Sequence, residues 1–367
     1  MQEEQGNTTT TPGDSRSPSF TSMEESIPIE PLTDDDDDVL LADNDNDGGS
    51  SSRHDTTSDY DSGEEETRFG SVTSSVGGHV WEYGRRYHAF RYGRYYLPND
   101  EGEANRESLR HEMLKDLLGG KLYAAPIGSN PQKIIDLGTG FGEWAIEMGE
   151  EFPSAKVIGV DLSPIQPHWI PPNVEFIVDD IEDEWAHASD FDYAHFRFVN
   201  TTLRDNEGVL RKVFQNLKPG GWIEIQDILP RTASDDDTIP AHYAIRRFYS
   251  MIEPVVRERY GADLYLMDRM PQLLESTGFT NVQRRVFHIP LGEWPRDRHL
   301  RLIGALFRET VKEFVDAMAA KPLVEAGYER DEIDELLKDV AEDLGNRRIH
   351  AYVPIHFVWA QKPLVGT

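Results

Sequence analysis

An open α/β sheet with helices on both faces is the fold that this sequence predicts, and three observations support the prediction. From residue 133 onward, short apolar runs typical of buried strands alternate with segments of helical spacing. A glycine-rich turn joins the first of these strands to the first helix. Acidic residues stand at or just after the ends of the next strands. This order predicts parallel strands joined by right-handed crossovers in a doubly wound sheet.

The predicted elements of this sheet follow one another closely along the chain. Strands are expected at QKIIDLG (132–138), KVIGVDL (156–162), VEFIV (174–178), FDYAHFRFV (191–199) and WIEIQDIL (222–229). Helices are expected at EWAIEMGEEF (143–152) and NEGVLRKVFQNL (206–217), and KPGG (218–221) predicts a turn.

The C-terminal part of the chain is predicted to be more helical. Apolar residues keep helical spacing from Ile245 to Val256, from Ile303 to Met318 and from Ile333 to Leu344. NVQRRVFHIP (281–290) and VPIHFVWAQ (353–361) alternate like strands. These two strands are expected to close one edge of the sheet, with the helices of 294–346 inserted between them. Two interpretations of these helices are open: they form a lid or a substrate wall, or they simply pack against the sheet.

The N-terminal residues 1–78 are predicted to be an acidic, disordered tail before a domain at 79–367. Between Met1 and Gly70 there are twenty Asp or Glu, three Arg and no Lys, so this stretch carries −17 of the formal net charge of −30. Runs such as DDDDD (34–38) cannot bury enough apolar surface to offset chain entropy. The tail is interpreted as a solvated linker or, alternatively, as an arm that binds protein partners.

Composition excludes several classes of function. The absence of cysteine excludes disulfides, metal–thiolate sites and thiol nucleophiles. The N-terminus lacks the pattern of a signal peptide and no apolar run reaches membrane-spanning length, so we expect an intracellular protein of the cytoplasm or nucleus, with no membrane partner. The strongly negative charge makes nucleic acid an unlikely partner. The twelve scattered histidines predict no metal site.

The stretch IIDLGTGFGEW (134–144) carries the chemistry. Gly138, Gly140 and Gly142 stand where a strand turns into a helix, and there the lack of side chains lets backbone N–H groups approach a ligand. Asp161 lies at the end of the second strand, twenty-three residues after Gly138, and can accept hydrogen bonds from two ribose hydroxyls. The pair predicts a nucleoside site.

The spacing of the loop identifies the nucleoside ligand further. A dinucleotide loop has a third glycine at the position where this chain has Glu143. Asp136, beside the loop, would repel a pyrophosphate but suits a ligand with an ammonium and a sulfonium group. After the third strand, Asp180 rather than Asp179 is expected to accept from the adenine amine, with Ile181 flanking the ring. S-adenosylmethionine therefore fits better than NAD.

Four segments together resemble a known family. They are IIDLGTGFGEWAIEM, EFPSAKVIGVDLSPIQP, PPNVEFIVDDIEDEW and LKPGGWIEIQDI. They are similar to class I S-adenosylmethionine-dependent methyltransferases, and most similar to the fungal LaeA-like family, over residues 80–364. The resemblance implies a Rossmann-like seven-stranded sheet with helices on both faces. It also implies a lid (79–120), a cofactor-binding core (131–230), substrate-side helices (231–350) and a last strand (353–361).

The resemblance also implies roles for individual residues. His195 would lie at the floor of the methyl-transfer site, but Phe196 and the following VNTT replace the small residues expected there. The methionine part of the cofactor would be surrounded by Asp136, Gly138, Thr139, Gly140 and Gly142, the ribose by Asp161 and Leu162, and the adenine by Asp180 and Ile181.

A catalytic base is optional in this chemistry. Methyl transfer from a sulfonium needs mainly approach geometry and exclusion of water. Only a hydroxyl or ammonium acceptor must lose a proton. His195 is the first candidate base, followed by His88 and Asp227, and each can equally be a structural residue.

Three functions are consistent with these patterns. The first is methyl transfer to a small-molecule acceptor, a secondary metabolite. The second, implied by the resemblance, is a regulator of secondary-metabolite gene expression that acts through protein partners. The third is an RNA or DNA methyltransferase, and it rests on the Arg- and Tyr-rich segment EYGRRYHAFRYGRYYLPNDE (82–101).

In context, the Arg- and Tyr-rich segment is better explained as an active-site lid. It lies just before the predicted helix EANRESLRHEMLKDLL (103–118), where class I methyltransferases cover their cofactor. Its arginines can pair with Asp100, Glu101 and other acids, or with the carboxylate of the bound methionine moiety. The residues expected to face the methyl group are among Tyr87, His88, Tyr95 and Tyr96. Structural packing and nucleic-acid contact are the alternatives.

Overall fold

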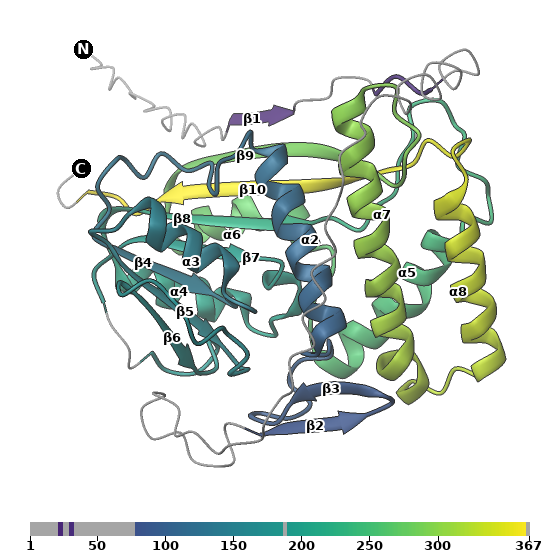
Figure 1. The fold of residues 1–367 in the computed structure, drawn as a ribbon. Helices are drawn as coiled ribbons and strands as arrows, with labels where there is room; N and C mark the ends of the chain where they lie inside the picture. Colours follow the sequence, from purple (N-terminus) through teal and green to yellow (C-terminus); the bar gives the residue numbers. More distant parts are fainter. Residues whose placement is uncertain (1–20, 25–28, 33–77, 186–188, 365–367) are drawn as a thin grey trace, which may run out of the picture.

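A twisted eight-stranded sheet forms the middle of the protein (Figure 1). The structure is a computed structural model that describes residues 21–24, 29–32, 78–185 and 189–364. The strand order is β1-β9-β10-β8-β7-β4-β5-β6, and β10 runs antiparallel to β8 and β9 while the other pairs are parallel. The strands are β1 (Thr21–Glu24), β4 (Lys133–Leu137), β5 (Lys156–Asp161), β6 (Val174–Val178), β7 (Phe191–Arg197), β8 (Leu217–Ile228), β9 (Thr280–Pro290) and β10 (Tyr352–Gln361). The seven strands from β4 to β10 confirm the predicted sheet.

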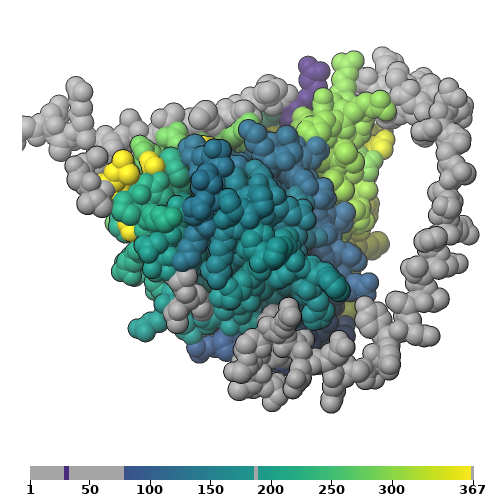
Figure 2. Space-filling view, turned by 60° about the vertical axis from the view of Figure 1, so that its left-hand side comes forward, coloured from purple at the N-terminus to yellow at the C-terminus, as the bar shows by residue number. Residues whose placement is uncertain are grey.

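Helices cover both faces of the sheet, as predicted. Ile134 of β4 packs into one apolar cluster and its neighbour Ile135 into the other, because successive strand residues point to opposite faces. The first cluster includes residues of α2 (Glu101–Leu117) and α3 (Glu143–Glu151), and the second includes residues of α4 (Asn206–Asn216) and α6 (Met270–Thr277). In Figure 2, α2 in blue and the teal residues that follow it form one continuous surface, with the green of α7 beside it.

Three long helices stand together at one end of the sheet (Figure 1). They are α5 (Ala244–Val255), α7 (Arg298–Met318) and α8 (Arg330–Gly345). The helices α7 and α8 lie between β9 and β10 in the sequence, which confirms the predicted insert. Short π-helical turns, Val256–Tyr260 and Ala319–Leu323, follow α5 and α7.

The KPGG segment is not the simple turn that was predicted. Strand β8 begins at Leu217, opposite Phe191, and its next partner pair is Trp222 with Tyr193, so the strand is irregular between them. Gly220 has a φ of 83°, a conformation that glycine adopts without steric cost. Its N–H donates to the carbonyl of Lys362, at 2.9 Å, so the irregular segment is held by the chain after β10.

One short part of the N-terminal tail, Thr21–Glu24, pairs with the sheet. Strand β1 pairs in parallel with β9, so β1 and not β9 forms that edge. Leu32 donates its N–H to the carbonyl of Trp294 at 2.8 Å, and Arg296 donates to that of Glu30 at 2.7 Å. Between these two contacts, Pro31 and Pro295 form an isolated antiparallel bridge outside the named strands. The DDDDD run lies outside the described residues.

The predicted lid is a hairpin followed by a loop and a helix. Strands β2 (His79–Glu82) and β3 (Arg85–His88) pair in antiparallel fashion below α2 and α7 (Figure 1). Asp100 caps α2, since its side chain accepts from the N–H of Glu103 at 3.1 Å. Arg85 binds the same carboxylate through two nitrogens, at 2.6 and 2.8 Å, which confirms the predicted pairing with Asp100. No helix in the described part of the chain has the length and apolar character that crossing a membrane requires.

Candidate active site

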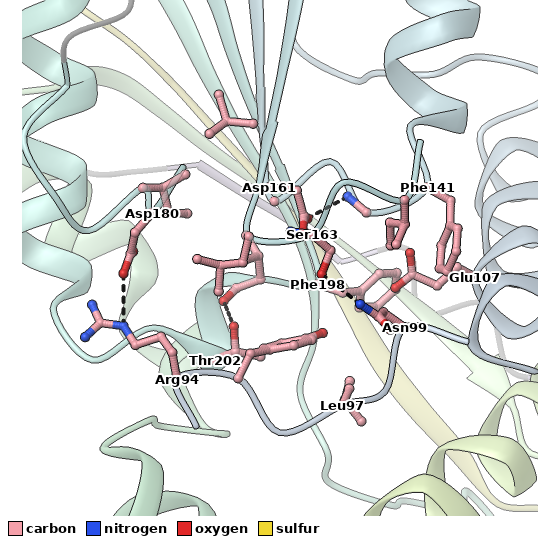
Figure 3. A pocket seen from close by; sticks show the side chains of 18 of the residues that line it. Arg94, Leu97, Asn99, Glu107, Phe141, Asp161, Ser163, Asp180, Phe198 and Thr202 are labelled. Carbon is pink, nitrogen blue, oxygen red and sulfur yellow. Dashed lines mark hydrogen bonds and ion pairs between the residues drawn. The ribbon is translucent and has the colours of Figure 1, made fainter. Parts of the chain in front are cut away.

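The carboxyl ends of four neighbouring strands open onto one cavity, which we call the strand-end cavity (Figure 3). It holds about 850 Å³ of empty space, a volume that includes open solvent at its mouth. Lid residues 94–99 cover it. Figure 3 shows Arg94 and Asp180 at one end, Phe141 and Glu107 at the other, and Asp161 between them. Six predicted cofactor residues meet here: Gly138, Gly140, Asp161, Leu162, Asp180 and Ile181.

Two glycines of the loop after β4 stand where there is no room for a side chain. Gly138 has a φ of 77°, and a Cβ there would lie 2.7 Å from Cγ2 of Val199. Gly142 has a φ of 85°, and a Cβ there would lie 2.4 Å from the ring of Phe176. Both positions therefore combine a left-handed backbone with close neighbours, which only glycine tolerates.

Asp161 lies half-buried at the end of β5, with capacity for a ligand. Its carboxylate accepts from the N–H groups of Gly140 and Ser163, each at 2.9 Å. Two carboxylate oxygens offer about four acceptor positions, so two remain for a diol. Burial raises the pKa of Asp161 to about 7, against the opposing effect of these two hydrogen bonds. The arrangement fits the ribose of S-adenosylmethionine.

This pKa predicts that cofactor binding depends on pH. Ribose hydroxyls donate to the ionised carboxylate, and below pH 7 its ionised fraction falls about tenfold per pH unit. We expect the affinity for S-adenosylhomocysteine to rise with pH up to about 7 and then to level, as measured by titration calorimetry between pH 5.5 and 8.5. Asp161→Asn should bind weakly and without this slope, and a flat profile for the unaltered protein would contradict the prediction.

Asp180 is held by an arginine of the lid, which the sequence did not reveal. Its Oδ2 lies 3.3 Å from Nε of Arg94, and its Oδ1 accepts from the N–H of Glu182 at 2.9 Å. Arg94 also pairs with the carboxylate of Glu182, at 2.9 Å. Asp179 lines the cavity as well. The lid is thus joined by ion pairs to the end of the cavity that is expected to take the adenine.

We expect Arg94→Ala to weaken S-adenosylhomocysteine binding about tenfold, mainly by faster dissociation, because the lid loses two partly buried ion pairs. Arg91→Ala is the matched control. Arg91 lies on the same lid segment and pairs with Asp183, but this pair is about half exposed and worth little. Stopped-flow tryptophan fluorescence measures the dissociation rate of S-adenosylhomocysteine from each of the two variants. Equal effects of the two substitutions would show that Arg94 has no special part in closing the lid.

A second, polar cavity adjoins the first and contains the other predicted residues of the loop. Asp136 accepts from Oγ1 of Thr139 at 2.6 Å and from Nδ1 of His195 at 2.7 Å. The His195 ring stacks on Trp144, with ring centres 3.7 Å apart and planes 7° apart. Burial lowers the pKa of His195 although Asp136 opposes the effect, so the ring is neutral and donates through Nδ1. The polar cavity includes Asp136, Thr139, Gly142 and His195 in its lining.

An apolar cavity meets the strand-end cavity at Leu97, Phe198 and Thr202, which line both. It holds about 660 Å³ of empty space, including its mouth. Asp227, fully buried at the end of β8, lines it. Its walls come from the lid, α2, α5, α7 and the segments after β7 and β8; they include Tyr96, Tyr249, Phe307, Val311 and Phe314.

The four lid residues expected near the methyl group separate into two pairs. Tyr95 lines the strand-end cavity and Tyr96 the apolar cavity. Tyr87 and His88 line neither. Nζ of Lys321 lies 4.5 Å from the centre of the Tyr87 ring, and Nε2 of His88 lies 3.4 Å from the carbonyl oxygen of Arg91. Tyr87 therefore contacts the π-helical turn after α7, and His88 contacts another residue of the lid.

Charged residues of α2 at the cavities were missed by the sequence analysis. Glu107 lines both the strand-end and the polar cavity, and its carboxylate fills the space where a Cβ on Gly140 would lie. It pairs with Arg110 at 2.9 Å, and the Arg110 guanidinium lies 3.8 Å from the centre of the Phe198 ring. The only available signal was the spacing of opposite charges three and four residues apart, which also occurs on solvated helices.

One group of side chains in the described residues has the spacing of metal ligands. Nitrogen and oxygen atoms of His111, Glu112 and Glu147 lie within 4.8 Å of one another. Lys115 already binds Glu147 at 2.8 Å, and Arg197 lies 2.8 Å from Nδ1 of His111. These two cations already contact His111 and Glu147, so the group is better described as an ion-pair network.

Comparison with known proteins agrees with this geometry. A family model described as a methyltransferase domain matches residues 109–284. The methyltransferase pytC of Aspergillus terreus is 35% identical over 296 residues, which cover 80% of this chain and 91% of that protein. The secondary metabolism regulator LAE1 of Cochliobolus heterostrophus is 35% identical, covering 77% and 94%. The protein-methionine methyltransferase laeA of Emericella nidulans is 32% identical, covering 77% and 76%.

Proposed function

The chain belongs to the LaeA-like family of S-adenosylmethionine-dependent methyltransferases, and we propose that it methylates a small molecule held in the apolar cavity. The observation that carries this proposal is the junction of the two cavities at Leu97, Phe198 and Thr202. An acceptor in the apolar cavity lies next to the cofactor site and behind the lid and α7. A cavity walled by the lid and α7 suits a small molecule better than a segment of folded protein.

In this proposal the residues of the strand-end cavity hold S-adenosylmethionine. Asp161 would bind the ribose, and Asp180 with Ile181 the adenine. Asp136 accepts one hydrogen bond at each oxygen, from Thr139 and His195, and we assign its remaining acceptor positions to the ammonium group of the cofactor. The cofactor supplies an electrophilic methyl group on a sulfonium. The protein's part is to align the acceptor and to exclude water.

A transfer assay tests the proposal. The purified protein is incubated with methyl-labelled S-adenosylmethionine and an extract of the producing organism. We expect label in a low-mass product, and Gly138→Ala should abolish it because the cofactor no longer binds. Label found only on protein would overturn the small-molecule acceptor while leaving the methyltransferase activity standing.

A second candidate function is regulation through protein partners, in the manner that the resemblance implies. Several relatives are named secondary metabolism regulators, which favours this candidate. It predicts that substitutions at Gly138 or Asp161 abolish cofactor binding and yet leave the effect on metabolite production intact. Loss of that effect together with cofactor binding would exclude a role independent of methyl transfer.

Nucleic acid is the least supported acceptor. The lid arginines, which motivated it, bind acceptors of this same chain: Arg85 binds Asp100, Arg86 binds Asn99, Arg91 binds Asp183, and Arg94 binds Asp180 and Glu182. Donors engaged in this way are not available to phosphates, and affinity for nucleic acid depends on such contacts.

A further inference from the structure

The apolar cavity holds a buried carboxylate that the cofactor site does not use. We infer that the cavity takes a neutral, largely aromatic acceptor through a hydroxyl group, and that Asp227 removes the hydroxyl proton during methyl transfer. This inference rests on the proposed function. It adds the class of acceptor, the acceptor atom and the residue that accepts the proton.

The walls of the cavity favour a flat apolar molecule. Rings are contributed by the lid, α5 and α7 through Tyr96, Tyr249, Phe307 and Phe314. Val311 and Leu264 complete these walls with aliphatic side chains. Aromatic rings that come from several directions pack against an aromatic ligand by edge and face contacts.

The positive charges at this cavity are already compensated. Arg106 donates to Glu103 through two nitrogens, one of them at 2.9 Å from the carboxylate, and Arg110 pairs with Glu107. An acceptor that carries a carboxylate would find no uncompensated cation among these residues, and burial of an unpaired charge is costly. The cavity therefore suits a neutral acceptor.

Asp227 has one acceptor position left for such a molecule. Its carboxylate accepts from the N–H of Ile228 at 2.8 Å and the N–H of Thr201 at 3.3 Å, and the single hydroxyl hydrogen of Thr201 is shared between its two oxygens, at 3.3 and 3.4 Å. Three donors fill three of about four positions. A hydroxyl of the acceptor can donate to the fourth, and that is the hydrogen bond along which a proton transfers.

The surroundings of Asp227 adjust its basicity. Arg110 of α2, Tyr96 of the lid, Tyr249 of α5 and Thr310 of α7 line the same cavity. Burial raises the pKa of Asp227 to about 6, although its hydrogen bonds and Arg110 oppose the increase. The carboxylate is therefore ionised at neutral pH and is a stronger base than an exposed aspartate.

The charges balance in the step. The hydroxyl proton moves to Asp227, the oxygen electron pair forms the new C–O bond, and the pair of the breaking C–S bond goes to sulfur. A negative carboxylate and a positive sulfonium are both neutralised. Little net charge is left in a cavity that excludes water, which favours the step in surroundings of low polarity.

A binding experiment tests the site without knowledge of the natural acceptor. The probes are 2-naphthol and naphthalene, titrated into the protein in the presence of S-adenosylhomocysteine and followed by fluorescence. We expect saturable binding of 2-naphthol that is tighter than that of naphthalene and at least tenfold weaker in Val311→Trp. Leu302→Trp, on an exposed position of the same helix, is the control and should bind within twofold of the unaltered protein.

Two results of this titration would overturn the site. They are a lack of saturable 2-naphthol binding, and binding that Val311→Trp leaves unchanged. Affinity for S-adenosylhomocysteine and the melting temperature report whether each variant is folded. If Val311→Trp does not fold, the smaller replacement Val311→Phe is measured in the same way, with the same expectation of weaker binding.

Asp227→Asn tests the proton acceptor. We expect it to bind both S-adenosylhomocysteine and 2-naphthol, while formation of the labelled low-mass product falls about 100-fold. At saturating S-adenosylmethionine, where the pH dependence of cofactor binding no longer affects the rate, the rate of the unaltered protein should rise through pH 6, and this rise should be absent in the variant. The ¹³C chemical shift of a transferred ¹³C-methyl group should identify an O-methyl product. An unchanged rate in Asp227→Asn, or an N-, S- or C-methyl product, would overturn the inference. Label on protein alone would instead mean that the proposed function has failed.

Discussion

Gly138→Ala should abolish measurable binding of S-adenosylhomocysteine while the protein stays folded. An alanine at a φ of 77° is strained by about 1–2 kcal/mol. Its Cβ would also lie 2.7 Å from Val199, so the loop or Val199 must move. Because both line the strand-end cavity, we expect the movement to weaken binding at least 100-fold, as measured by titration calorimetry.

Gly84→Ala is the matched control for this prediction. Gly84 has a φ of 75° in the turn of the β2–β3 hairpin, and a Cβ there would have no neighbour within 4 Å. Gly84→Ala should therefore show the same backbone strain as Gly138→Ala. It causes no steric overlap, and position 84 does not line the strand-end cavity. We expect a similar small decrease in stability and unchanged cofactor affinity. If both variants lost binding equally, backbone strain and not the close approach would be the cause.

The sheet could be predicted, and the loop glycines and strand-end acids could be expected to meet in one cavity, because both depend on local patterns. Buried strands such as KIIDL are short apolar runs, and the glycine loop needs its residue types at fixed positions for backbone reasons. Asp161 and Asp180 follow from their place at strand ends, since the carboxyl ends of parallel strands meet at one edge. The sequence is therefore sufficient where adjacency in the chain implies adjacency in space.

The acceptor end could not be predicted, because its residues are brought together by tertiary packing. Tyr96 and Phe314 are more than two hundred residues apart in the chain and line one cavity. The pairing of Arg94 with Asp180 likewise joins a loop to a distant strand end. The parallel strand β1 is another such case, since nothing in Thr21–Glu24 indicates which edge it joins. Side-chain spacing along the chain contains no information about such contacts.

The single substitution with the largest expected effect on stability is Glu224→Ala, in the centre of the sheet. Glu224 is fully buried and its carboxylate accepts four hydrogen bonds. They come from the N–H groups of Ala124 at 2.9 Å and Ala125 at 2.7 Å, the hydroxyl of Tyr193 at 3.0 Å and Nε2 of Gln226 at 2.8 Å. The carboxylate thus ties the segment between α2 and β4 to strands β7 and β8.

Removal of this carboxylate leaves several buried donors without a partner. Each unsatisfied buried group costs about 1–3 kcal/mol, so we expect Glu224→Ala to lower the free energy of unfolding by about 3–5 kcal/mol in urea titrations. Glu224→Gln keeps one acceptor oxygen, so its free energy of unfolding should lie between those of the unaltered protein and of Glu224→Ala. Glu175→Ala, which breaks the exposed pair with Lys156 at 2.7 Å, is the surface control and should cost less than about 1 kcal/mol. If the Glu224→Ala protein were as stable as the control, the segment between α2 and β4 would be positioned by apolar packing alone. The position of this segment matters because α2, which precedes it, contributes Glu107 and Arg110 to the cavities.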